Sequence, residues 1–375
     1  MKKIYIFSIY IIIIFFTFTA CSDQINKPDF NNEKNLTGKS TYASSVEESQ
    51  KEDNNLNDES RSINKSNTST SNKQTNTQKM SSTNNVKKER NIIYSPFTGK
   101  QIKNKNFNKV VMASIENSPQ ARPQSGLDKA SIVYEFLVEG GITRFLALYW
   151  KDIPDKLGPI RSVRPYMVEI AKEYKALLLH AGASPEGFEA LQKGDISHLD
   201  QIYNGNYFWR SSDKNIPHNL YTKNKIKDYL NELTGQQYKS RFNFQHINFI
   251  TSNRKAEEII IDFWGKYDVL FRYDLNNNNY KRFLYDFNTP HLTENGDQIT
   301  TKNIIIRFVP VNVKDDVGRL QLNLKGEGKA YIFKNGEIIK GKWKSQNNNW
   351  TFYYDNNNNR IKLNPGSTWI EIVPD

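Results

Sequence analysis

Five arginines in the middle of this chain stand where a guanidinium group could bind an anion. Arg161 and Arg164 lie three apart in "LGPIRSVRPY", residues 157–166, a segment that Pro159 and Pro165 keep out of a helix interior. On such a stiff loop a guanidinium group is a planar fork that matches a carboxylate or a phosphate. Of the other three, Arg122 precedes Pro123, Arg144 follows the Gly140-Gly141 turn and Arg210 follows Trp209. We therefore predict an anion-binding pocket; the alternative is that these arginines pair with glutamates inside the fold.

Two carboxylates and a histidine in the same region are candidates for catalysis. Glu135 and Glu139 are four apart in "YEFLVEGG", so on a strand they would face the same side about 13 Å apart. Because glycosidases need roughly 5–9 Å between their two carboxyl groups, the pair favours a cleavage that uses a single glutamate as the acid. His180 ends the apolar run "LLLH" and could assist as an acid or base. The alternative for His180 is a core histidine that donates to a backbone carbonyl.

Other reaction classes find no support in the sequence. The chain has a single cysteine, Cys21, and it has no histidine pair at metal-ligand spacing, no G-x-S-x-G elbow and no P-loop. These absences argue against zinc hydrolases, serine hydrolases and nucleotide hydrolases, and we predict neither a metal nor another cofactor. Whether a divalent cation joins Asp128 and the glutamates is left open by the sequence.

The first twenty residues predict export and a lipid anchor. Lys2 and Lys3 precede an apolar run that ends in small residues, as in a secretory signal peptide. The end of this segment, Phe18-Thr19-Ala20-Cys21, resembles the lipobox of a bacterial lipoprotein. The resemblance implies cleavage before Cys21, a diacylglycerol on its sulfur with palmitate as an acyl chain, and a place on the extracytoplasmic face of the cell membrane. The alternatives are an uncleaved membrane anchor and an ordinary signal peptide.

Residues 21–92 predict a disordered tether that carries the folded part away from the membrane. The segment consists mostly of Asn, Ser, Thr, Lys and Glu, with too few aliphatic residues to bury a core. The whole chain has a formal charge of +12, which in an exported protein favours anionic lipid or wall polymers as partners over nucleic acid. The alternative for the charge is the Lys- and Asn-rich composition that an AT-rich genome favours.

The remaining residues predict an α+β protein of two domains. In residues 93–242 apolar and β-branched runs, expected as strands, alternate with helical patterns at 164–176, 184–194 and 222–235, which predicts a mixed α/β domain. Residues 243–375 read as short alternating strands between Asn- and Gly-rich turns, such as "KNGE", which predicts a mostly-β domain.

Several strings in both domains resemble one known family. "ENSPQARPQSGLDKASIVYEFLVEGGITRFLALY", "LGPIRSVRPY", "LLLHAGASPEG" and "IPHNLYT" in the first half, and "LNLKGEGKAYIFKNGEIIKGKW" and "LNPGSTWIEIVP" in the second, resemble the DUF3048 family of Gram-positive, YerB-like lipoproteins. The resemblance implies an envelope-anchored protein of two domains and implies no reaction. From the arginines themselves we expect a membrane-anchored lipoprotein whose arginine-rich pocket binds an anionic envelope ligand, peptidoglycan or a lipid-linked glycan, and that helps to maintain the envelope. The alternatives are a glycan-cleaving or glycan-transferring wall enzyme and a scaffold for another envelope protein.

The lipid anchor gives the first testable prediction. Cys21→Ser removes the sulfur that would be acylated, so the chain should leave the membrane or accumulate unprocessed. Fractionation of cells after a high-salt wash measures this. A variant that is processed and still stays with the membrane would contradict the anchor.

Overall fold

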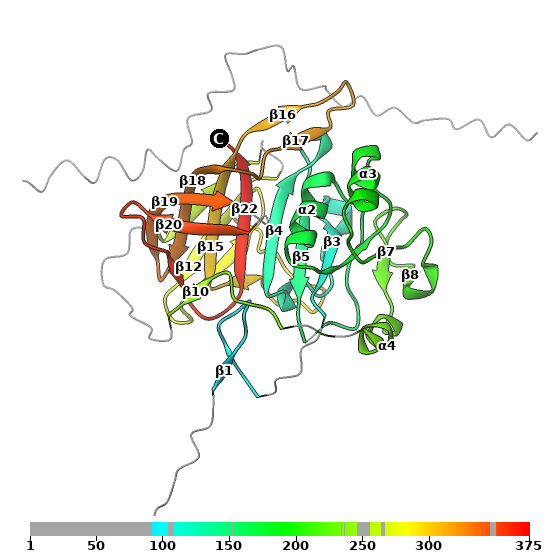
Figure 1. The fold of residues 1–375 in the computed structure, drawn as a ribbon, viewed down its shortest axis with the longest axis horizontal. Coiled ribbons are helices and arrows are strands. Elements are labelled where there is room, and N and C mark those ends of the chain that lie inside the picture. Colours follow the sequence, from blue (N-terminus) through cyan, green and yellow to red (C-terminus); the bar gives the residue numbers. More distant parts are fainter. Residues whose placement is uncertain are drawn as a thin grey trace, which may run out of the picture. The chain divides into compact units, whose positions relative to one another are not determined.

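The computed structural model of the chain describes residues 92–103, 109–151, 153–233, 235, 237–245, 256–263, 267–345 and 350–375 (Figure 1). The predicted signal peptide, Cys21 and all of the predicted tether except residue 92 lie outside these residues. Among the described helices, none is both long enough and apolar enough to span a bilayer.

A ten-stranded mixed sheet forms the centre of the fold. In spatial order its strands are β20 (Thr351–Asp355), β19 (Glu337–Ser345), β18 (Glu327–Lys334), β15 (Asn303–Val309), β22 (Thr368–Pro374), β4 (Ile132–Leu137), β5 (Thr143–Tyr149), β3 (Val111–Glu116), β6 (Leu177–His180) and β7 (His198–Asp200). The pairs β15–β22, β22–β4, β3–β6 and β6–β7 are parallel, and β5 runs antiparallel between β4 and β3. The carboxyl ends of β4, β3, β6 and β7 therefore lie along one edge of the sheet.

Both halves of the sequence contribute to this sheet. β22, near the end of the chain, lies between β15 and β4 and pairs in parallel with both. The contact extends over five aligned pairs from Thr368–Ile132 to Ile372–Phe136. The predicted boundary between residues 242 and 243 therefore separates segments that share a continuous sheet, and that boundary stays a prediction.

Helices cover one face of the sheet. The structure confirms the three predicted helices as α2 (Pro165–Glu173), α3 (Pro185–Lys193) and α4 (Lys225–Glu232). The Tyr166 ring of α2 lies 5.3 Å from the Phe136 ring of β4, and the Tyr166 hydroxyl donates to the Leu137 carbonyl at 2.8 Å. Ser184 caps α3 as its side chain accepts from the Gly187 amide at 3.1 Å. The apolar side of α2 is buried against the sheet, and these contacts place the first turn of α2 at the carboxyl end of β4.

A four-stranded antiparallel sheet lies against the other face. Its strands are β11 (Glu258–Ile261), β12 (Val269–Asp274), β13 (Asn279–Phe283) and β14 (Thr300–Thr301). Four short pairs complete the described strands: β1 (Ile93–Tyr94) with β2 (Gln101–Ile102), β8 (Phe208–Arg210) with β9 (Leu220–Thr222), β10 (Asn243–Phe244) with β21 (Lys362–Leu363), and β16 (Val311–Val313) with β17 (Leu320–Leu322). The turn predicted at "KNGE" is confirmed between β18 and β19, and β4 and β5 pair as a hairpin across Gly140-Gly141.

A buried ion pair joins the two sheets. Arg282 of β13 donates through Nη2 to Glu135 Oε2 of β4 at 2.8 Å, and neither side chain is exposed by more than 1%. The guanidinium group lies 5.5 Å from the centre of the Phe145 ring and 5.0 Å from that of Trp369. Glu371 of β22 is aligned with Glu135 and is also fully buried. Burial, and then the charge of Glu135, raise the pKa of Glu371 well above its ordinary value.

Glu371 gives a prediction about stability and pH. Because the pKa of Glu371 is raised in the folded state, its contribution to the free energy of unfolding is fully present below the ordinary pKa of about 4.3. That contribution is lost as pH rises towards the pKa of the folded state. Glu371→Gln removes the titration, so its unfolding free energy should rise relative to that of the parent by about 1.4 kcal/mol per pH unit between about pH 4.3 and the raised pKa of the folded state. Urea unfolding of the full chain in a non-ionic detergent at pH 5, 6 and 7 measures the gain. The matched control is Glu258→Gln, in an exposed pair with Arg272, which should give no such slope. A gain that is the same at all three values would show that Glu371 is ionised in the fold.

Candidate functional site

The loop 157–166 crosses the carboxyl edge of the central sheet. Its backbone is bonded on both sides: the Arg161 amide donates to the Ser114 carbonyl of β3 at 2.9 Å, and the Arg161 carbonyl accepts from the Ala181 amide, just after β6, at 3.1 Å. The Ile160 amide donates to the Leu220 carbonyl of β9 at 2.7 Å. Up to Arg164, after which α2 begins, the loop is therefore extended and fixed, as its prolines predict. This edge is where ligands bind in open α/β sheets.

Gly158 allows β9 to come this close. A Cβ atom at Gly158 would lie 2.6 Å from the Leu220 carbonyl oxygen, and its φ of +148° disfavours other residues. The loop and the segment before β9 are therefore held side by side by backbone contacts.

Two of the five predicted arginines hold the loop in place. Arg164 donates through Nε to Glu139 Oε1 at 2.6 Å and through Nη2 to the other oxygen of the same carboxylate. Arg144 of β5 is buried and donates through Nη1 to the Ser162 carbonyl at 2.7 Å. Burial, together with the neighbouring Arg164 charge, lowers the pKa of Arg144 to about 10. Burial alone would raise the pKa of Glu139, but the hydrogen bonds and charge of Arg164 outweigh it and lower the pKa. Arg164 fits the pairing with a glutamate that the sequence left as the alternative, whereas Arg144 is bound to a backbone carbonyl.

Arg122 and Arg210 have partners of their own. Arg122 donates through Nε to Asn117 Oδ1 at 3.0 Å, and its guanidinium group lies 5.7 Å from the centre of the Tyr267 ring. Burial lowers the pKa of Arg122 to about 10. Arg210 donates through Nη1 to Asn219 Oδ1 at 2.9 Å, and no hydrogen bond to the loop 157–166 is found for it among the described residues. The structure therefore does not bring all five arginines to one point.

Arg161 differs from Arg164, the other arginine of the loop, because most of its guanidinium group forms no hydrogen bond. Its Nε lies 3.4 Å from Glu116 Oε2, and its side chain is 30% exposed. Neither Nη atom forms a hydrogen bond to a described residue. Arg161 thus presents two donors at the carboxyl edge of the sheet, as a carboxylate or a phosphate requires.

Glu116, the last residue of β3, joins Arg161 to a histidine that the sequence analysis did not select. Glu116 Oε1 lies 2.8 Å from His218 Nδ1 and accepts from the Ser118 hydroxyl at 2.8 Å. His218 stands shortly before β9, and its side chain is 22% exposed. Glu116 and His218 are 102 positions apart, so no local spacing could reveal the pair. We call Glu116, Ser118, Arg161 and His218 the edge site.

The two glutamates predicted as catalytic do not share a strand face. Glu135 lies inside β4, completely buried against Arg282 and an Asn117 amide at 3.1 Å. Because β4 ends at Leu137, Glu139 lies in a 3-10 turn (Glu139–Gly141), and the expectation of one shared strand is wrong. Each carboxylate is held by its own arginine: Glu135 by Arg282 and Glu139 by Arg164. Their catalytic role stays a prediction.

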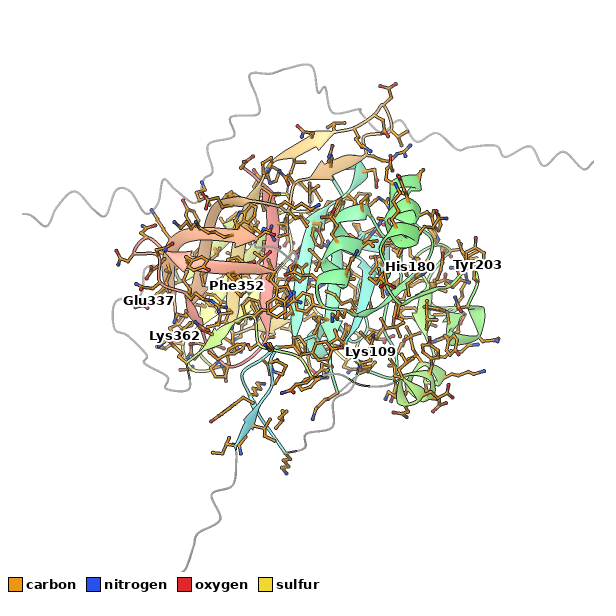
Figure 2. The ribbon with its side chains drawn as sticks, viewed as in Figure 1. Lys109, His180, Tyr203, Glu337, Phe352 and Lys362 are labelled. Carbon is orange, nitrogen blue, oxygen red and sulfur yellow. The ribbon has the colours of Figure 1, made fainter. Side chains whose placement is uncertain are left out.

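His180 lies inside the fold near α3 and β7 (Figure 2). Its Nδ1 is 2.9 Å from the Gly182 carbonyl oxygen and its Nε2 is 3.1 Å from His198 Nδ1. Burial lowers the pKa of His180, so the ring is held neutral. The backbone contact matches the core histidine that the sequence left as the alternative.

A cavity of about 300 Å³ adjoins the loop on the side of Arg164. It lies between α2, α3 and the β16–β17 pair, and four acidic and four basic side chains line it. Lys314 and Arg319 approach Glu186 of α3 at 3.4 Å across it. In the part of the chain that the structure describes, no three His, Cys, Asp or Glu side chains are grouped as a metal site requires.

The contacts of the two loop arginines predict different costs of removing them. Arg164→Met leaves the part-buried Glu139 without its partner, so the unfolding free energy should fall by about 1–3 kcal/mol. Arg161→Met removes a single long contact at a more exposed side chain and should cost about 1 kcal/mol or less. Urea unfolding of both variants in the same detergent compares them. A larger loss for Arg161→Met than for Arg164→Met would assign Arg161 to the internal framework.

Comparison with known proteins supplies the family. A model described as "Protein of unknown function (DUF3048) N-terminal domain" matches residues 97–239, and the model of the DUF3048 C-terminal domain matches residues 259–370. A protein of Bacillus subtilis (strain 168) described as "Putative lipoprotein YerB" is 32% identical over 296 residues, which cover 75% of this chain and 86% of that protein. The crystal structure of the YerB protein from Bacillus subtilis superimposes with a TM-score of 0.67 at 31% identity, covering 76% of this chain and 97% of that chain. The chain therefore belongs to the DUF3048 family and carries both of its domains.

Proposed function

We propose that this chain is a lipid-anchored protein of the cell envelope that binds an anionic group of an envelope glycan at the edge site. The observation that carries the proposal is the pair of unbonded Nη donors of Arg161, held at the carboxyl edge of the sheet. The backbone contacts of the loop fix the main chain of Arg161 before a ligand arrives, so binding has to order only the side chain.

The charges around the loop also favour an anion. Arg144, Arg161 and Arg164 lie close enough for their charges to act on one another, and Glu116 and Glu139 are the carboxylates in contact with Arg161 and Arg164. Three arginines against two glutamates give these five side chains one net positive charge, which belongs to the buried Arg144 and acts on the loop from behind Arg161. A carboxylate of a peptidoglycan stem or a phosphate of a lipid-linked or wall-linked glycan supplies the missing negative charge.

The membrane location rests on the amino-terminal sequence and on the relative. The predicted lipobox ends at Cys21, and the Bacillus subtilis relative is described as a lipoprotein. A lipid on Cys21 would hold the chain at the extracytoplasmic face of the membrane, where wall carboxylates and phosphates are in reach of the tether.

Retention on isolated cell walls tests the proposal. The detergent-solubilised full chain is sedimented with native walls and with walls stripped of phosphate polymers by mild acid. Arg161→Glu should lower retention at least tenfold because the carboxylate repels the anion. Arg161→Lys should lower it by less, since it keeps the charge and loses the planar fork. Retention on stripped walls would identify peptidoglycan carboxylates as the ligand, and its loss would identify phosphate.

The matched control is Arg272→Glu, which reverses an exposed arginine on β12 that pairs with Glu258. It should retain walls as well as the parent, since the net charge changes equally but at another place. Equal retention by Arg161→Glu and the parent, with both folded, would refute the edge site as a binding site.

A further inference from the structure

We infer that the edge site hydrolyses a phosphodiester, with His218 as the general base that activates water. The inference rests on the proposed function, because Arg161 must bind the phosphate that is attacked. It assigns a reaction and a catalytic residue, whereas the proposed function assigns binding alone.

The contact with Glu116 determines which ring nitrogen of His218 carries the proton. A carboxylate can only accept a hydrogen bond, so His218 Nδ1, 2.8 Å from Glu116 Oε1, must be the donor. In the neutral ring this leaves the lone pair on Nε2. Nε2 has no hydrogen-bond partner among the described residues, and the side chain reaches solvent. A base in the right tautomer is thus exposed at the edge of the sheet.

Glu116 is held so that it can orient the ring. It is 4% exposed, accepts from the Ser118 hydroxyl at 2.8 Å and lies 3.4 Å from Arg161 Nε. A buried carboxylate on Nδ1 fixes the imidazole and stabilises the imidazolium that forms when Nε2 takes up a proton. Glu116 is therefore a positioning residue, and His218 is the group that meets the reactants.

Water is the nucleophile that this arrangement allows. The Ser118 hydroxyl lies 3.2 Å from Nδ1, on the side of the ring away from the lone pair, and it already donates to Glu116. The mature chain has no thiol, because its single cysteine is the predicted lipid anchor. Because the His218 side chain is 22% exposed and Nε2 has no hydrogen-bond partner among the described residues, water is the nucleophile that can reach it.

The guanidinium group and the imidazole are neighbours across one carboxylate. Arg161 approaches Oε2 of Glu116 while His218 approaches Oε1. The Ile160 amide also bonds to the Leu220 carbonyl, two residues after His218, so the backbones of both groups are joined. An anion on the Nη atoms of Arg161 and a water molecule on Nε2 of His218 would therefore flank the same carboxylate.

The charge of the site selects a phosphodiester over a neutral ester. A phosphodiester carries one negative charge, which the Arg161 guanidinium group can bind because its contact with Glu116 is long, at 3.4 Å, and leaves both Nη groups unbonded. As water adds, the phosphoryl oxygens and the leaving oxygen gain charge that the two Nη donors stabilise. A carboxylic ester is neutral in its ground state and would leave the cation unmatched during binding.

The reaction balances with water alone. The water oxygen forms a bond to phosphorus as Nε2 of His218 takes one of its protons. The bond from phosphorus to the leaving oxygen breaks with its electron pair on that oxygen, which then takes the proton back from the imidazolium. The products are a phosphomonoester and an alcohol, and the site returns to its starting state.

Turnover and binding measured on the same variants test the inference. The detergent-solubilised full chain is incubated with bis(p-nitrophenyl) phosphate, and p-nitrophenolate release is followed by absorbance. His218→Ala should lower the rate about 100-fold or more, since general-base catalysis contributes 10²–10⁴-fold. Added imidazole should restore part of that loss. Glu116→Gln should also lower the rate, whereas wall retention should be unchanged in His218→Ala.

The outcomes separate the two proposals. No turnover by the parent, or equal turnover by the parent and His218→Ala, would overturn the inference while Arg161-dependent retention leaves the binding function intact. Hydrolysis of p-nitrophenyl acetate without hydrolysis of the phosphodiester would also overturn it, as would unchanged retention on walls stripped of phosphate. The control His198→Ala removes an exposed histidine of β7 that contacts His180, and it should keep the parental rate.

Discussion

The buried pairing of Arg282 with Glu135 is the contact on which the site depends. The two side chains are almost without access to water, and they join β13 of the small sheet to β4 of the large one. Glu135 also accepts from Asn117, and Asn117 in turn accepts from Arg122, so the bonds extend to the residues just after β3. A charge of this kind is very unfavourable when it loses its partner. The ion pair therefore specifies how the two sheets align and, through Asn117, where the end of β3 lies.

The edge site is assembled from three separate parts of the chain, and each is positioned by a different kind of contact. Sheet pairing places Glu116, since β3 lies between β5 and β6. Backbone hydrogen bonds to β3 and β9 place Arg161. A turn closed by the His218 amide and the Asn215 carbonyl at 2.8 Å places the histidine. Because main-chain contacts position these residues, the Nη donors of Arg161 and the Nε2 lone pair of His218 remain free to bind a ligand.

Sequence reasoning predicted local structure well and long-range contacts poorly. The helix at 164–176 follows from apolar spacing after Pro165, and the helix at 184–194 follows from Ser184 as its cap and Gly194 as its end. The stiff loop follows from Pro159 and Pro165. Nothing in the sequence of this loop distinguishes Arg161, with its free Nη atoms, from Arg164, which is bound to Glu139. The difference depends on which carboxylate lies opposite, and that depends on strand pairing. The Glu116–His218 contact and the insertion of β22 beside β4 were missed for the same reason.

The place of β22 has a consequence for how the chain reaches this structure. β22 is the last strand in chain order, yet it fills the space between β15 and β4 in the middle of the sheet. While the chain is being made, β4 has β5 on one side and an open row of amides and carbonyls on the other, with Glu135 on that strand. An open strand edge pairs readily with other chains. The first half therefore cannot reach its final state on its own, and the time between making β4 and β22 is the period in which newly made chains are most prone to aggregate.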